Sequence, residues 1–349
     1  MYRGLKIFSR AQAALLCITL ATFSLVPALR AQSAPATSAA AQAAPMAPAL
    51  LDVHWNPGAE DCKQDKQPAI QVHRYDAQTY ILRQNLCLSA EGNFLFLLLG
   101  SEKALLIDTG AIADHATMPV AKTVLDLLPT QNGAKLPLLV VHTHGHTDHR
   151  DGDAQFAGLP NVQVAPFDPE GVQKFFAFTQ WPEGLAHLDL GGHIVDVIPA
   201  PGHHRAHGVY YDENTTLLFT GDFLLNGRLL LEDTAADKAS AARVIAFVQN
   251  KPVAYVLGTH IEKNAGGELY TWGTTYHPRE HVLQLSKNDL LALPAALDQF
   301  NGFYTQSGQF VMMNQNRVLG AEAFAALLIL VMIIWAIWRF IKSRRRRKT

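Results

Sequence analysis

Short apolar runs alternate with amphipathic stretches along most of the chain. The runs have the length and composition of buried strands, and the amphipathic stretches have the 3.6-residue period of helices. Strands are predicted over 94–100, 103–107, 138–141, 194–198, 216–219 and 253–257, with a further edge strand over 309–313. Helices are predicted over 115–128, 168–178, 235–249 and 287–300. The pattern therefore indicates a mixed fold of strands and helices.

A longer apolar stretch lies near the N-terminus. It runs from Ala11 to Leu29, follows a basic start and precedes a run of small residues, which is the pattern of an export signal. We expect a signal peptide over 1–31, and an uncleaved N-terminal anchor is the alternative. Residues 32–50 are rich in Ala and Pro, so we expect a flexible linker there.

A second long apolar stretch lies near the C-terminus. From Val318 to Trp338 the only charged residue is Glu322, and about 20 apolar residues cross the core of a bilayer. We expect a transmembrane helix over 318–341. The positive-inside rule places the basic tail, 342–349, in the cytoplasm. The sequence thus predicts a single-pass protein of the cytoplasmic membrane whose domain is extracytoplasmic, in the periplasm if the cell is Gram-negative.

The region between signal and span, 51–317, is expected to form one acidic domain. From Gln32 to Val318 the chain holds 18 of its 29 basic residues and 29 of its 30 acidic ones. A net charge of about −11 argues against a nucleic-acid partner. Once the signal is removed, Cys62 and Cys87 remain. An even pair in an oxidising compartment favours a disulfide over metal ligation.

Residues of the types that bind metals are found immediately after four of the predicted strands. They are His144, His146, Asp148 and His149 in one short segment, then His203, Asp222 and His260 after three later strands. In an extended turn, His144 and His146 project to one side and can hold one ion, whereas Asp148 and His149 can face a second. Nitrogen and carboxylate ligands without thiolate suit Zn²⁺, and Fe or Mn is compatible. The pattern predicts a binuclear metal site.

These motifs, taken in order, resemble those of the metallo-β-lactamase superfamily. They are Leu106-Ile-Asp108-Thr-Gly110, His144-x-His146-x-Asp148-His149, Pro-Gly-His203, Thr-Gly-Asp222 and Gly-Thr-His260. The resemblance covers roughly Gln71 to Phe310. It implies an α+β fold, a four-layer αββα sandwich of two mixed sheets flanked by helices, with a two-metal site at one edge.

The resemblance also implies a role for each of these residues. His144, His146 and His203 would hold the first Zn²⁺ ion, Asp148, His149 and His260 the second, and Asp222 would bridge the two. Asp148 and Asp222 are the candidate catalytic proton acceptors, and Asp108 is expected to steady a ligand. His142 is expected to be a core or supporting residue. His204 and His207 are left open between pocket lining and ordinary loop.

The pattern favours an exported, membrane-anchored hydrolase acting on a small molecule. A metal-bridging hydroxide would attack an ester, lactone, thioester or related substrate. Lactam hydrolysis is one alternative, which is disfavoured because β-lactamases of this superfamily typically have Cys or Ser in place of Asp222. A non-catalytic binding protein on the same fold is another, and it is disfavoured because all seven ligand positions are filled. The pattern leaves the substrate and the oligomeric state open.

Overall fold

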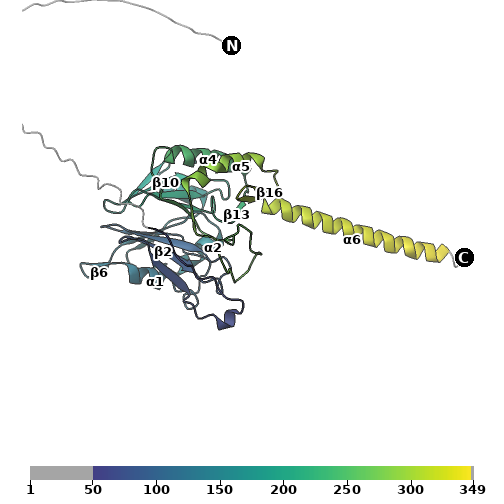
Figure 1. Cartoon of the computed structure of the whole chain (residues 1–349), viewed down its shortest axis with the longest axis horizontal. Coiled ribbons are helices and arrows are strands. Elements are labelled where there is room, and N and C mark those ends of the chain that lie inside the picture. The colour runs from purple at the N-terminus through teal and green to yellow at the C-terminus, as the bar shows by residue number, and fades with distance from the viewer. Residues whose placement is uncertain (1–49, 347–349) are drawn as a thin grey trace, which may run out of the picture. The chain divides into compact units, whose positions relative to one another are not determined.

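The computed structural model describes residues 50–346 (Figure 1). The expected signal peptide over 1–31, all but the last residue of the expected linker over 32–50, and the end of the expected tail lie outside the described residues.

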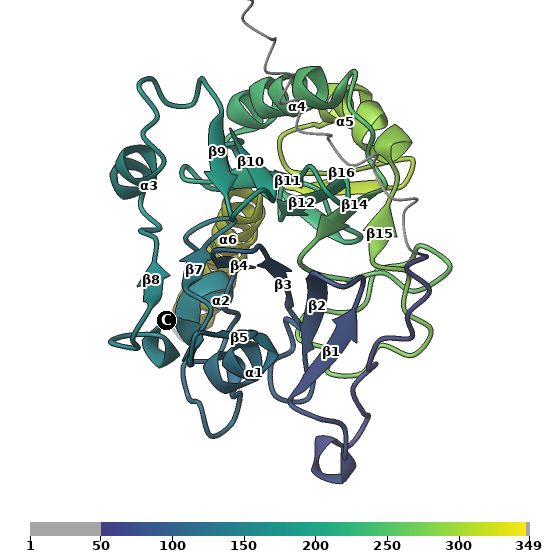
Figure 2. The ribbon, with the colours of Figure 1, turned by 90° about the vertical axis from the view of Figure 1, so that its left-hand side faces the viewer.

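Two six-stranded sheets face each other in the middle of the domain (Figure 2). The first has the order β1-β2-β3-β4-β7-β8, with β1 to β4 antiparallel and β4, β7 and β8 parallel. Its strands are β1 (Ile70–Arg74), β2 (Thr79–Gln84), β3 (Phe94–Leu99), β4 (Ala104–Ile107), β7 (Leu138–Val141) and β8 (Val162–Val164). The sheet is therefore mixed, as the resemblance implied.

The second sheet is mixed as well. Its order is β15-β14-β12-β11-β10-β9, and only β12 and β14 are parallel. The strands are β9 (Ala186–Asp189), β10 (Ile194–Pro199), β11 (Gly208–Asp212), β12 (Leu217–Gly221), β14 (Tyr255–Gly258) and β15 (Gln284–Leu285). β7, β10, β12 and β14 are the strands that precede the four groups of candidate ligands.

Helices cover the outer face of each sheet, so three hydrophobic cores separate four layers (Figure 2). α1 (Val120–Leu127) packs on the first sheet with the 3-10 helix η2 (Asp151–Gln155) beside it, and α4 (Thr234–Val248) and α5 (Lys287–Gln299) pack on the second. Between the sheets, the rings of Phe96 and Phe219 lie 4.6 Å apart. Strands covered on both faces explain the continuous apolar runs of the sequence.

Two predicted helices are shorter than their sequence patterns. The pattern over 115–128 gives α1 only from Val120, because Asp114 accepts backbone hydrogen bonds from a preceding turn and Pro119 stands before the helix. The pattern over 168–178 gives α3 (Pro169–Phe175), whose N-cap Asp168 accepts a hydrogen bond from Gly171. A short α2 (Thr147–Arg150) lies in the segment that was expected to be extended.

A small third sheet corrects one prediction. The strand expected at an edge over 309–313 is β17 (Phe310–Met313), which lies in the centre of the order β13-β17-β16. It pairs in parallel with β13 (Arg228–Leu230) and antiparallel with β16 (Tyr304–Ser307). The edge assignment was wrong because neither partner strand, of three and four residues, was predicted from the sequence. Within residues 50–346 the remaining elements are η1 (Cys62–Gln64), β5 (Thr130–Gln131) and β6 (Ala134–Lys135).

The C-terminal apolar stretch forms one helix, α6 (Gln315–Arg346) (Figure 1). Within residues 315–340 the most apolar window has a mean hydropathy of 2.5, and none of that window is buried against the described chain, so α6 is long and apolar enough to cross a membrane. At about 1.5 Å per residue it measures about 48 Å. The helix begins three residues before the expected span of 318–341 and continues into the expected tail.

The predicted disulfide is present. Cys62 and Cys87 are bonded, with their Cα atoms 5.2 Å apart. The bond ties η1 to the turn that follows β2.

We expect replacement of both cysteines, Cys62→Ser with Cys87→Ser, to lower the free energy of unfolding by about 3 kcal/mol, because the bond closes a loop of 25 residues in the unfolded chain. Urea denaturation measures the difference. A reducing agent should destabilise the native protein by the same amount and leave the double variant unchanged. An unchanged midpoint in the double variant would contradict the expectation.

Candidate metal centre

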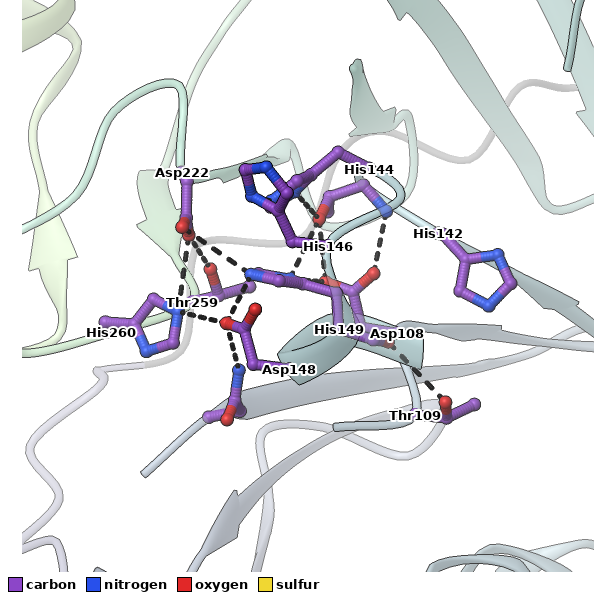
Figure 3. Close-up of polar contacts among 12 residues, drawn as sticks. Asp108, Thr109, His142, His144, His146, Asp148, His149, Asp222, Thr259 and His260 are labelled. Carbon is purple, nitrogen blue, oxygen red and sulfur yellow. Dashed lines mark hydrogen bonds and ion pairs between the residues drawn. The ribbon is translucent and has the colours of Figure 1, made fainter. Parts of the chain in front are cut away.

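The seven candidate ligands converge at one edge of the two sheets (Figure 3). His144 and His146 lie in the loop after β7, and Asp148 and His149 lie in α2 directly behind it. His203, Asp222 and His260 follow β10, β12 and β14 of the other sheet. Loops at strand ends are free to aim side chains, so both sheets contribute to one site.

Three histidines form a first cluster. The Nε2 of His144 lies 2.9 Å from the Nδ1 of His146 and 3.2 Å from the Nε2 of His203. The nitrogens of His146 and His203 are 3.1 Å apart. Three ring nitrogens that face one another at these separations have the donor set of a histidine metal site.

A second cluster combines two histidines with two carboxylates. The Nε2 of His149 lies 3.1 Å from an oxygen of Asp148 and 3.5 Å from one of Asp222. The Nε2 of His260 lies 3.5 Å and 3.4 Å from oxygens of the same two carboxylates. Figure 3 shows the four side chains directed at a common point.

Asp222 lies between the two clusters. Its Oδ2 is 3.7 Å from the Nε2 of His203 in the first cluster, and its two oxygens also contact His149 and His260 in the second. The hydroxyl of Thr259 donates a hydrogen bond of 2.5 Å to the Oδ1 of Asp222. The preceding Gly221 has a φ of 53°, and a Cβ there would lie 2.6 Å from the Cβ of Thr143. The Thr-Gly-Asp motif is therefore a turn that only glycine permits.

Three histidines are oriented by backbone or carboxylate acceptors. The Nδ1 of His203 donates to the carbonyl of Leu230, and that of His260 to the carbonyl of Glu91, both at 2.8 Å. The Nδ1 of His149 lies 3.0 Å from the Oδ2 of Asp108. In each ring the Nε2 is left facing the cluster, an arrangement that fixes the tautomer a metal ligand needs.

Asp108 supports the site through several bonds. Its carboxylate accepts hydrogen bonds from the backbone and hydroxyl of Thr143, at 2.7 and 2.8 Å, and holds His149. Asp108 is buried and has a φ of 65°, a left-handed conformation that Asp adopts more readily than most residues. Its contacts are those expected of a residue that steadies a ligand.

The electrostatics of the two clusters differ. Burial and the neighbouring ring of His149 hold the pKa of His144 well below its usual value, so its nitrogens are free to bind a cation. Burial also opposes the charged form of His260, but the carboxylates of Asp222 and Asp148 outweigh it and raise the pKa of His260 to about 10. The second cluster therefore attracts positive charge.

The remaining histidines of these loops lie outside both clusters. His142 is buried and its Nε2 is 2.9 Å from the Oδ1 of Asp153, away from the ligands (Figure 3). His207 is fully buried, and its ring stacks on that of His144 at 5.0 Å. The Nδ1 of His204 accepts a hydrogen bond from the backbone of Ala206.

Two carboxylates near the site contact its loops from outside the two clusters. Asp153 holds His142 and accepts a hydrogen bond from Thr109. Asp237 of α4 is buried against the turn of His203: it accepts a hydrogen bond from the His203 backbone, and burial raises its pKa to about 8. No sequence signal marked Asp237, because it lies 34 residues further along the chain.

A pocket of about 450 Å³ opens over the clusters. Beyond the candidate ligands, its charged lining consists of Glu91, Glu232, Glu262 and Arg228. The guanidinium of Arg228 lies 3.1 Å from Glu262 and 4.4 Å from the ring of Trp272. The pocket wall therefore has three carboxylates and one cation that is already paired.

The fold and the site together define a class of protein. Two mixed sheets with helices outside carry two neighbouring His/Asp clusters at one edge, which is consistent with the metal centre of a metallo-hydrolase. A family model described as "Metallo-beta-lactamase superfamily" matches residues 91–285, more than half of the chain. The chain belongs to the metallo-β-lactamase superfamily.

Curated relatives include hydroxyacylglutathione hydrolases and an acyl-coenzyme A thioesterase. The chain is 31% identical over 161 residues to a hydroxyacylglutathione hydrolase of Yersinia enterocolitica, over 45% of this chain and 57% of that protein. It is 24% identical over 220 residues to an acyl-coenzyme A thioesterase of Bos taurus, over 52% and 77% of the two chains. The match thus spans little more than half of the Yersinia relative.

Solved structures of metallo-β-lactamases are also similar. One, from Pontibacter korlensis, is 17% identical with a TM-score of 0.44, and the match covers 66% of this chain and 100% of that one. Another, from Erythrobacter litoralis, is 15% identical with a TM-score of 0.45, over 68% and 99%.

Proposed function

We propose that this protein is a membrane-anchored hydrolase that uses two metal ions, Zn²⁺ in the first instance, to cleave an acyl ester, lactone or thioester. The observation that carries the proposal is the position of Asp222 within 3.7 Å of a three-histidine cluster and within 3.5 Å of a second cluster. One carboxylate that reaches two sets of ligands is the arrangement a pair of ions requires.

The donor set fits the two ions. His144, His146 and His203 would hold the first, Asp148, His149 and His260 the second, and Asp222 both. Bound there, two divalent ions would supply an activated water and polarise the substrate carbonyl. Of the chain's own groups, Asp148 and Asp222 both face His149 and His260, so they would be placed to accept a proton from that water.

The relatives favour an acyl substrate, and the charge of the pocket wall restricts the rest of that substrate. The curated proteins to which the chain is similar are named for cleaving glutathione and coenzyme A thioesters. Both of those carriers are anionic, whereas the pocket wall here carries Glu91, Glu232 and Glu262. We therefore expect an acyl substrate whose remaining part is neutral or cationic.

The test is a panel of substrates on the full-length, zinc-loaded protein, with ester, lactone, thioester, lactam and phosphodiester members. We expect elemental analysis to give close to two metal ions per chain, because both ligand sets are complete. In the activity assays we expect turnover of the ester, lactone or thioester substrates. Absence of bound metal after expression with zinc would contradict the metal centre. Preference for lactams would contradict the acyl class.

The same proposal assigns a topology. The signal over 1–31 and a span over 318–341 would place the domain 51–317 outside the cytoplasm and the tail 342–349 inside it. The length and hydropathy of α6 and the disulfide support this arrangement. A reporter that is active only outside the cytoplasm should be active when it is fused at residue 314, and a reporter that is active only in the cytoplasm should be inactive there. Activity of the cytoplasmic reporter at residue 314 would contradict the topology.

A further inference from the structure

The pocket and the C-terminal helix share residues. Gln315 and Asn316, in the first turn of α6, line the pocket together with Trp272. The uninterrupted apolar run of α6 begins at Ala323, seven residues after Asn316. Since a helix rises 1.5 Å per residue, the part of the pocket wall at Asn316 lies about 10 Å along the helix axis from the start of the apolar run.

The joint between domain and helix is short and bonded. β17 ends at Met313, and α6 begins two residues later. The side-chain amide of Asn314 between them donates a hydrogen bond of 2.7 Å to the carbonyl of Leu231, and its Oδ1 accepts one from the backbone of Arg317. Leu231 is itself part of the pocket wall. A span that continues from this joint would keep the pocket close to the membrane surface.

Aromatic side chains are exposed beside the same joint. Phe303 and Tyr304 are 49% and 46% exposed. The backbone of Asn314 donates to the carbonyl of Phe303, and Tyr304 pairs with Met313 across the small sheet. Trp272, at the pocket, is 50% exposed. Aromatic residues gathered where a span begins are typical of the headgroup layer of a bilayer.

From these placements we propose that the pocket opens onto the bilayer surface and takes amphiphilic acyl substrates from it. Phe303, Tyr304 and Trp272 would lie in the headgroup layer. The acyl chain would stay among the lipids while its carbonyl enters the pocket. Water cleaves the ester C–O or thioester C–S bond, which yields a carboxylic acid and an alcohol or thiol. The choice of substrate rests on the proposed hydrolase function. The position of the pocket at the bilayer surface, called its seating below, rests on the proposed span.

The seating is tested without any substrate. Full-length protein with Cys17→Ser is placed in phosphatidylcholine vesicles and labelled with bimane at Phe303→Cys, Tyr304→Cys or, as a control, Val72→Cys. Val72 is 40% exposed on β1 of the first sheet. Lipids brominated near the headgroup should quench the label at 303 and 304 and leave the label at 72 bright. Equal fluorescence loss at the three sites, or no loss at 303 and 304, would overturn the seating.

The substrate class is tested with two thioesters of the same neutral thiol, one butanoyl and one hexadecanoyl. In vesicles, we expect kcat/KM to be at least about tenfold higher for hexadecanoyl, equivalent to about 1.4 kcal/mol. Phe303→Ser with Tyr304→Ser should lose that advantage and keep the butanoyl rate, and Val72→Thr should change neither.

Each failure has its own meaning. Equal rates for the two thioesters in the native protein, or an advantage that survives in the double variant, would overturn delivery from the bilayer. If neither thioester is cleaved while the other panel substrates are, the thioester form of the inference is overturned. If no substrate of the panel is cleaved, the hydrolase function fails instead, and the quenching result still decides where the pocket lies.

Discussion

Replacing Asp222 with Ala should lower hydrolysis by about 10³-fold or more and leave the protein folded. Asp222 is the carboxylate within reach of both clusters. Without it, two neighbouring cations would have no negative charge between them, and the second site should weaken or empty. Folding should survive because the cores are built from apolar strands such as β3 and β14. Activity assays and elemental analysis on the same sample measure both effects.

His142→Ala is the matched control for Asp222→Ala. His142 belongs to the same group of loops, but its ring contacts Asp153 and not the candidate ligands. We expect this variant to keep both metals and to lose less than the about 10–100-fold that is typical when a partner of a metal ligand is removed, because His142 bonds no candidate ligand. An inactive His142→Ala beside a fully active, two-metal Asp222→Ala would show that the ligand assignment is wrong.

Replacing Asp108 with Ala should have the second largest effect. The change removes the acceptor of three hydrogen bonds, from the backbone and hydroxyl of Thr143 and from His149, and leaves buried donors unpaired. An unpaired buried group costs about 1–3 kcal/mol, so unfolding free energy should fall by about 3 kcal/mol. His149 would lose its orientation, and we expect second-site affinity to fall by about 10–100-fold.

Two further variants separate the causes of the Asp108→Ala effect. Asp108→Asn tolerates the left-handed backbone and keeps one acceptor oxygen, so its losses should be intermediate. Asp114→Ala removes an exposed carboxylate that also accepts bonds from its own turn, but lies outside the site. Chemical denaturation and zinc titration should show little change for Asp114→Ala. Zinc binding by Asp108→Ala equal to that of the native protein would contradict the supporting role of Asp108.

The sequence predicted the elements that follow a local pattern. Strands β3, β4, β7, β10, β12 and β14 lie where apolar runs placed them, and the seven ligand-type residues after them do come together. Their individual metal roles remain predictions. The positions of the ligands were predictable because each lies in a segment that follows a buried strand closely, where loops are free to aim side chains.

Long-range partners account for most of what the sequence did not predict. β2 was missed because its apolar run is short and is followed within the strand by the buried Arg83. The guanidinium of Arg83 lies 2.5 Å from the carboxylate of Glu280, which is 197 residues further along the chain. Asp237 was missed for the same reason, since its contact with the turn of His203 depends on how α4 packs. A charged residue within a strand is interpretable only when its partner is known.

The disulfide has a consequence for how the protein matures. The turn that carries Cys87 is closed by its own backbone hydrogen bonds, among them Ser89 to Asn85 and Gly92 to Ser89. Four residues after Cys87, the carbonyl of Glu91 fixes the ring of His260. We therefore expect oxidation of the thiols before metal binding to favour a complete centre, because the bond anchors the turn that leads to Glu91. A chain whose thiols stay reduced would possess every ligand and yet offer the incoming ion a looser second site.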